Sequence, residues 1–137
     1  MKKLFALCLS LTLMLVACGS PESQIKGHTY KFIAEDAKRT SKHSMTIQFF
    51  NDGTMTNKME YDGTGLVEEE KGKYHIKDNK LTITYEGANL TFNPLEEVAK
   101  NKYKTTINVV EYKGQSMNGK EFQDAEGFGY YSVERIE

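Results

Sequence analysis

The chain has 137 residues, 27% of them charged, and a formal net charge of −1. This length suffices for one small domain with a single hydrophobic core, but not for two. The near-neutral charge argues against a nucleic-acid-binding module, because such modules are usually strongly basic.

The first 17 residues have the pattern of a secretory signal peptide. Lys2 and Lys3 precede an uncharged apolar run over residues 4–17. This run is shorter than the ~20 residues that a helix needs to cross a bilayer. We therefore expect residues 1–17 to be a signal peptide that is removed from the mature protein.

The four residues Leu15-Val16-Ala17-Cys18 resemble the lipobox of bacterial lipoprotein precursors. In that family the cysteine thiol receives a diacylglyceryl group, and the cysteine becomes the mature N-terminus. The resemblance implies that Cys18 is lipidated, since a thiolate is the nucleophile that forms the thioether. Its acyl chains would then hold the protein on a membrane. Cys8 would be lost with the signal peptide, so no disulfide could form within the mature chain.

A short polar segment follows the lipobox. Residues 19–26 read GSPESQIK, and we expect residues 18–26 to comprise the lipidated cysteine and a short tether. One folded domain is expected over residues 27–137. Loss of Lys2 and Lys3 would leave 16 of the 18 basic residues against 19 acidic ones, a mature net charge of about −3.

Beyond the tether, short segments that alternate apolar and polar residues predict β-strands. In one of them Met45, Ile47 and Phe49 share one face of the strand. The predicted strands cover residues 29–34, 45–50, 54–61, 73–77, 81–86, 103–112 and 128–136. Turn-forming residues lie between neighbouring strands at 51–53, 62–63, 78–79 and 87–89. Consecutive hairpins of this kind predict an antiparallel meander.

Two segments do not fit the strand pattern. Residues 34–42 are polar, and we expect a loop there with at most one helical turn. Residues 94–100 begin with Pro94, carry two glutamates early and end with Lys100. Proline suits the first position of a helix and these charges suit the helix dipole, so we predict one short helix over 94–100.

The expected fold class is all-β. About eight strands in a chain of this length predict a small antiparallel up-and-down β-barrel, or a strongly curved meander sheet, with at most one or two short helices. Closure or strong curvature avoids a long exposed edge strand.

Four stretches, at residues 27–30, 49–55, 72–83 and 130–136, resemble small bacterial lipocalin-like lipoproteins. That family combines a lipobox with an up-and-down β-barrel, so the resemblance implies the same fold here. Lipocalins carry a Gly-x-Trp pattern near the first strand, whereas this chain has no tryptophan and places Tyr30 there. The ligand-binding properties of lipocalins are therefore not carried over.

The sequence shows no clear motif for catalysis or metal binding. His28, His43 and His75 are not spaced for joint ligation with each other or with Cys or carboxylate residues. In Glu68-Glu69-Glu70, successive strand residues would point to opposite faces, so at most two could share a calcium ion. We expect no metal, no cofactor and no catalytic residue. A cell-envelope hydrolase is the alternative from another functional class.

Large aromatic and methionine side chains suggest how the domain binds other molecules. The residues expected to line the interior are Tyr30, Met45, Phe49, Met59, Tyr74 and Tyr130. A barrel of eight strands is just wide enough to be filled by its own side chains or to hold one small ligand. With so many large side chains we expect a filled interior and recognition of an envelope protein through the surface. A carrier of a small apolar ligand is the alternative.

Together these features predict a non-enzymatic, lipid-anchored binding module on the extracytoplasmic face of a bacterial cell membrane. The Lys- and Asn-rich composition favours a Gram-positive cell. In a Gram-negative cell, Gly19 after the cysteine would direct the protein to the outer membrane. A minor alternative gives the function to the signal peptide itself, since residues 11–17 resemble a short apolar peptide pheromone.

Overall fold

The computed structural model describes residues 21–38, 41–62, 64–65 and 67–137. The signal peptide, Cys18 and Gly63 of one predicted turn lie outside the described residues. The strands are β1 (Thr29–Glu35), β2 (His43–Phe49), β3 (Thr54–Tyr61), β4 (Val67–Lys77), β5 (Lys80–Tyr85), β6 (Ala88–Phe92), β7 (Glu96–Ala99), β8 (Lys102–Thr105), β9 (Ile107–Tyr112), β10 (Gln115–Asn118) and β11 (Tyr130–Arg135). Two short helices, α2 (Pro21–Ile25) and α3 (Gly119–Glu126), accompany them. No helix within the described ranges is long and apolar enough to cross a membrane.

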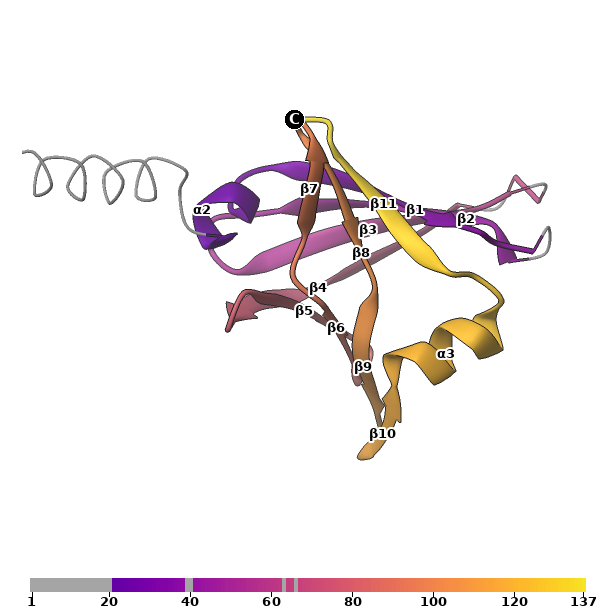
Figure 1. The fold of residues 1–137 in the computed structure, drawn as a ribbon. Coiled ribbons are helices and arrows are strands. Elements are labelled where there is room, and N and C mark those ends of the chain that lie inside the picture. The colour runs from indigo at the N-terminus through magenta and orange to yellow at the C-terminus, as the bar shows by residue number, and fades with distance from the viewer. Residues whose placement is uncertain (1–20, 39–40, 63, 66) are drawn as a thin grey trace, which may run out of the picture.

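All eleven strands belong to one antiparallel sheet, which curls strongly (Figure 1). Its order is β10-β9-β6-β5-β4-β3-β2-β1-β11-β8-β7. β8 and β9 follow each other in the chain, separated only by Thr106, yet β8 pairs with β11 and β9 pairs with β6. The chain itself therefore links the two ends of the curled sheet. The predicted all-β fold with a curved antiparallel sheet is confirmed, with more strands than expected.

The predicted helix over residues 94–100 is wrong. Residues Glu96–Ala99 form β7, which pairs with β8 and lies at one edge of the sheet. All four of its side chains are exposed, and within residues 94–100 Leu95 alone packs against the core, so the segment has little apolar surface that would hold a helix against the sheet. Pairing with β8 instead satisfies part of the backbone.

Residues 21–25, which we expected to be part of the tether, form α2. Ile25 is only 3% exposed and joins the core. The hydroxyl group of Tyr30 donates a hydrogen bond of 2.7 Å to the carbonyl oxygen of Gln24. Residues 21–25 are thus packed against the domain rather than forming an extended tether.

The core lies on the concave side of the curled sheet. Its largest fully buried side chains, each less than 2% exposed, are Tyr30, Phe32, Met45, Ile47, Phe49, Met55, Asn57, Ile83, Phe92 and Val133. Aromatic rings touch in tilted and edge-to-face pairs, for example Phe49 with Tyr74, whose centroids are 4.9 Å apart. Such pairs add to the stabilisation that burial provides.

Asn93 forms hydrogen bonds with residues at the junction between β8 and β9. Its backbone N–H donates to the carbonyl oxygen of Thr106, and its side-chain Nδ2 donates to the Thr106 hydroxyl at 2.7 Å. Its carbonyl oxygen accepts from the Thr105 hydroxyl, and its Oδ1 accepts from Nδ2 of Asn108. We call residues 93, 105, 106 and 108 the Asn93 clasp.

Substitution Asn93→Ala is expected to destabilise the domain by about 1–3 kcal/mol, because it removes two side-chain hydrogen bonds and leaves partly buried partners unsatisfied. Urea unfolding followed by circular dichroism measures this. Asn89→Ala is the control, since Asn89 Oδ1 accepts one hydrogen bond, from Thr84 within a local hairpin. Equal losses for the two variants would contradict a special role of the clasp.

Candidate functional site

The two helices mark opposite ends of the curled sheet (Figure 1). β1 begins beside α2, where Tyr30 bonds to Gln24. It ends beside the segment after α3, where Gly129 N–H donates to the carbonyl oxygen of Glu35 at 3.0 Å. We call these the α2 end and the α3 end.

Three of the predicted lining residues pack together at the α2 end. Phe49 contacts both Tyr30 and Tyr74 in edge-to-face geometry. The hydroxyl of Tyr74 donates to the carbonyl oxygen of Phe50 at 2.6 Å, and burial raises the pKa of Tyr30 to about 12. Because these rings are buried and their hydroxyls are bonded to the backbone, they serve as core at this end.

An inner pocket of about 180 Å³ opens at the α3 end. Its apolar lining consists of Met45, Met59, Leu90, Phe122 and Phe128. Its polar lining consists of His43, Tyr61, Tyr85, Glu126 and Tyr131. Two of the predicted lining residues, Met45 and Met59, thus contribute to a real hollow.

Tyr130 is not among the residues that line this pocket. It is half-buried, and the Lys104 ammonium nitrogen lies 4.3 Å from the centre of its ring. Its neighbour Tyr131 is 2% exposed and belongs to the core. Neighbouring strand residues face opposite sides, and the register of β11 turns Tyr131 inward.

His43 and Tyr131 form the polar back of the inner pocket. His43 Nδ1 lies 2.8 Å from the carbonyl oxygen of Ser41, which can only accept, so Nδ1 carries a hydrogen. In the neutral ring Nε2 is then an acceptor, and the Tyr131 hydroxyl donates to it at 2.7 Å. Burial, followed by nearby negative groups, raises the pKa of Tyr131. The Tyr131 oxygen keeps lone pairs free to accept a further hydrogen bond.

Helix α3 covers part of the pocket and is held there by polar contacts. Gln123 is 5% exposed; its Oε1 accepts from the backbone N–H of Ile107 at 2.6 Å, and its Nε2 donates to the carbonyl oxygen of Gly129. A Cβ atom on Gly119 would lie 1.8 Å from the Ile107 carbonyl oxygen, so only glycine fits there. This docking positions Phe122 and Glu126, which lie four residues apart on one helix face.

One carboxylate lines the inner pocket, and two more lie on the inward face of β4. In the β3–β4 ladder Glu68 is opposite Met59 and Glu70 is opposite Asn57. Directly opposed residues share a face, so both glutamates lie on the concave side. Burial, then the charges of Glu86 and Glu68, raise the pKa of Glu70. Glu126 lines the hollow, whereas Glu68 and Glu70 lie on the same face of the sheet as the pocket residue Met59; we call these three residues the acidic lip.

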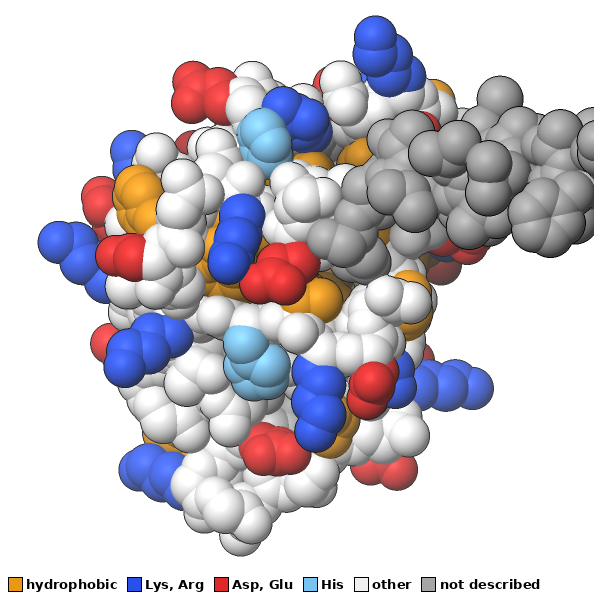
Figure 2. Space-filling model, turned by 90° about the vertical axis from the view of Figure 1, so that its left-hand side faces the viewer, with side chains coloured by type: hydrophobic (Ala, Val, Ile, Leu, Met, Phe, Trp, Pro, Cys, Tyr) orange, Lys and Arg blue, Asp and Glu red, His pale blue; other side chains and the backbone are white. Residues whose placement is uncertain are grey.

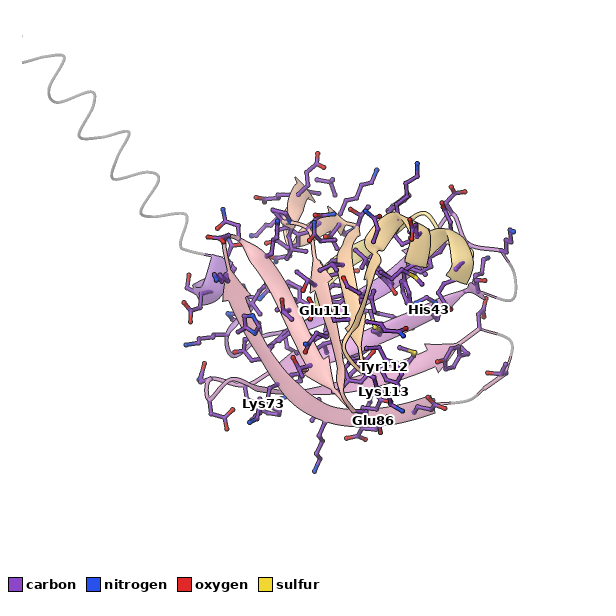
Figure 3. The ribbon with its side chains drawn as sticks, turned by 90° about the horizontal axis from the view of Figure 1, so that it is seen from below. His43, Lys73, Glu86, Glu111, Tyr112 and Lys113 are labelled. Carbon is purple, nitrogen blue, oxygen red and sulfur yellow. The ribbon has the colours of Figure 1, made fainter. Side chains whose placement is uncertain are left out.

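An outer groove of about 510 Å³ lies on the convex side of β1–β3 at the same end. Among its lining residues the apolar Ile33 and Val67 are exposed, at 36% and 55%, and the Tyr61 ring is 38% exposed. Charged residues border it, among them Lys31, Glu35, Lys42, Glu60 and Asp62. His43 and Tyr61 line both hollows, and Figure 3 shows His43 toward α3.

Comparison with known protein families identifies the family of this domain. Residues 23–119, well over half of the chain and including β1 to β10, match the model of the lipocalin-like domain. The chain belongs to the lipocalin-like domain family. A search of curated proteins found no match. The lipocalin-like fold is typically a non-enzymatic binding fold, so this domain is best described as a binding module.

Within the described part of this lipocalin-like domain, no three His, Cys, Asp or Glu side chains come together as metal ligands would. Sequence reasoning missed the other pocket residues, which are His43, Tyr61, Tyr85, Leu90, Phe122, Glu126, Phe128 and Tyr131. The alternation of residues 81–86 does place Tyr85 on the apolar face with Ile83, so this signal was available for Tyr85.

Glu70→Gln is expected to stabilise the lipocalin-like domain at pH 7. A raised pKa means that the folded state binds the proton more tightly than the unfolded state. The contribution of Glu70 to stability is therefore greatest at pH values below the ordinary pKa of a glutamate, and it is lost as the pH rises through the raised pKa. The advantage of the variant should therefore shrink as pH falls toward about 4. Urea midpoints at several pH values measure it. Glu69→Gln, on the opposite face, should change stability by less than about 0.5 kcal/mol; an equal gain there would contradict the explanation.

Proposed function

We propose that this protein is a lipid-anchored, non-enzymatic binding module of a bacterial envelope, which recognises another envelope protein through the surface at its α3 end. The observation that carries this proposal is the occupied interior: the concave side is packed with the protein's own rings and methionines. The inner pocket, at about 180 Å³, is smaller than the roughly 300–1,000 Å³ typical of pockets for drug-sized ligands.

The positions of the two ends support this proposal. Cys18 precedes Pro21, the first described residue, by three positions, so an acyl anchor there would sit close to the α2 end. β1 spans seven residues from the α2 end to the α3 end, about 20 Å. Figure 2 shows the α2 side of the molecule, where acidic and basic side chains are interspersed. The α3 end, with its two hollows, would face away from the membrane.

Lipidation is tested by metabolic labelling with alkyne-palmitate in the source bacterium. We expect Cys18→Ala to abolish labelling, because the thiol that forms the thioether is gone. Cys8→Ala is the matched control and should be labelled like the wild type, since Cys8 lies within the predicted signal peptide. Labelling of the Cys18→Ala protein would contradict the proposed anchor.

Partner recognition is tested by site-specific photo-crosslinking in living cells. A benzophenone amino acid at Val67, exposed at the α3 end, should give one discrete protein adduct. The control is the same amino acid at Val98, which is 61% exposed in β7, close to the turn at Asn101 that bonds to Arg135 near the α2 end. No adduct at Val67, or equal adducts at both sites, would argue against recognition through the α3 end.

The methionine-lined inner pocket supports a second candidate, a carrier of one small apolar ligand. Native mass spectrometry of the protein purified gently from its own envelope separates the two. A discrete mass increment that disappears on denaturation would favour the carrier, and a clean mass would favour surface recognition.

A further inference from the structure

We propose that the inner pocket at the α3 end receives a single lysine or arginine side chain of the protein partner. This inference rests on the proposed function and adds to it the chemistry of the central contact.

The size of the pocket sets the size of its occupant. A cavity of about 150 Å³ holds one benzene molecule, so about 180 Å³ accommodates one side chain rather than an acyl chain. The pocket also opens beside the outer groove, with which it shares His43 and Tyr61. A side chain inserted here would be surrounded by further surface that its own protein could cover, as around a binding hot spot.

The charge around the pocket favours a cation. Among the lining residues Glu126 is the one acidic residue, and none is Lys or Arg. Burial raises the pKa of Tyr61, and the charges of Glu68, Glu70 and Glu126 raise it further, so all three carboxylates act on this pocket-lining side chain. Over the described ranges the one ion pair is Lys26 with Glu22, so none of the described lysines or arginines forms an ion pair with a lip carboxylate.

Glu86 is not counted in the acidic lip. It lies in the β5–β6 turn, and the ladder between β6 and β9 sets that turn beside Lys113 (Figure 3). Lys113 itself lies over the ring of Tyr112, with its nitrogen 5.2 Å from the ring centre. The charge of Glu86 also raises the pKa of Glu70, so these hairpin tips adjoin the acidic lip, but Glu86 does not line the pocket.

Several acceptor atoms in or near the pocket can take a further hydrogen bond. Asn57 lies two residues before Met59 on the same face of β3, outside the pocket lining; it is 1% exposed, and its Oδ1 is the one buried side-chain polar atom without a hydrogen-bond partner among the described residues. Glu70, opposite Asn57, and the Tyr131 oxygen also accept. Lysine and arginine side chains offer only donors.

The apolar part of the lining suits the rest of such a side chain. Met45, Met59 and Leu90 can pack against the methylene stem, while the charged group remains near the lip. The rings of Tyr61, Tyr85 and Phe122 present π-faces that attract a cation, most strongly where water is excluded. A neutral or anionic group of equal size would leave the acidic lip unpaired and is therefore disfavoured.

The test uses the full lipoprotein in detergent, labelled with ¹³C-methyl methionine. The probes are n-butylammonium and n-butylguanidinium, which mimic the two side chains, with n-butanol and butyrate as uncharged and anionic controls. We expect saturable shifts of the Met45 and Met59 methyl signals with the two cations only. Met55 and Met117 serve as internal controls, since neither lines the pocket.

Glu126→Gln should weaken cation binding about fivefold, the loss expected for one partly screened carboxylate. Glu121→Gln, exposed on α3 away from the pocket lining, is the matched control and should bind like the wild type. Equal shifts with n-butanol would overturn the assignment of a cation, and no shift with any probe would show that the pocket admits no side chain.

The source of the cation is tested in membranes that carry the Val67 crosslinker. Excess n-butylammonium and the Glu126→Gln change should each reduce the partner adduct, while n-butanol and Glu121→Gln should not. An adduct that persists unchanged would overturn insertion of a partner's side chain, although surface recognition would stand. If no adduct forms even without a competitor, the proposed function fails, and the methyl titration still reports separately whether the pocket binds cations.

Discussion

The position of every functional feature depends on how the chain joins the two ends of its curled sheet. Before Thr106 the chain pairs with β11, and after Thr106 it pairs with β6. Where a chain changes its partner strand, some backbone N–H and C=O groups have no partner in the sheet. The Asn93 clasp supplies these hydrogen bonds from one residue. β9 is thereby held beside β6, and Ile107 is placed where Gln123 and Gly119 can dock α3. Glu126 of α3 therefore reaches the pocket because the sheet is joined in this way.

The side chains on the concave side differ in polarity between the two ends of the sheet. At the α2 end, rings are buried and their hydroxyls are bonded to backbone carbonyls, which is the arrangement of a stable core. Toward the α3 end, Glu126 lines the inner pocket, and Glu68 occupies an inward position opposite the pocket residue Met59. Sequences usually avoid inward acidic residues because they reduce stability, and this choice supports the proposal that the α3 end is the site of recognition.

The sequence predicted what depends on local pattern and missed what depends on distant partners. Period-two alternation was enough to find residues 45–50 and 54–61 as strands, and hairpin turns were enough for the curved meander. Residues 103–112 looked like one strand because the change of partner at Thr106 leaves no local signal. Tyr130 and Tyr131 could not be told apart, since only the register with β1 decides which faces inward. α3 escaped prediction because Gln123 and Gly119 dock it in place of an apolar stripe.

The orientation on the membrane determines on which molecules the charge of the acidic lip acts. With the anchor at Cys18 as proposed, the α2 end lies against the headgroups and the lip lies about 20 Å away, beyond the Debye length of about 8 Å at physiological salt. Its negative potential is then screened from an anionic membrane and acts on molecules that approach from outside. Charge of this kind speeds encounter with a basic partner and disfavours acidic ones more than it adds affinity. The affinity would come from the one desolvated contact inside the pocket, where aromatic faces and unpaired acceptors surround the inserted side chain.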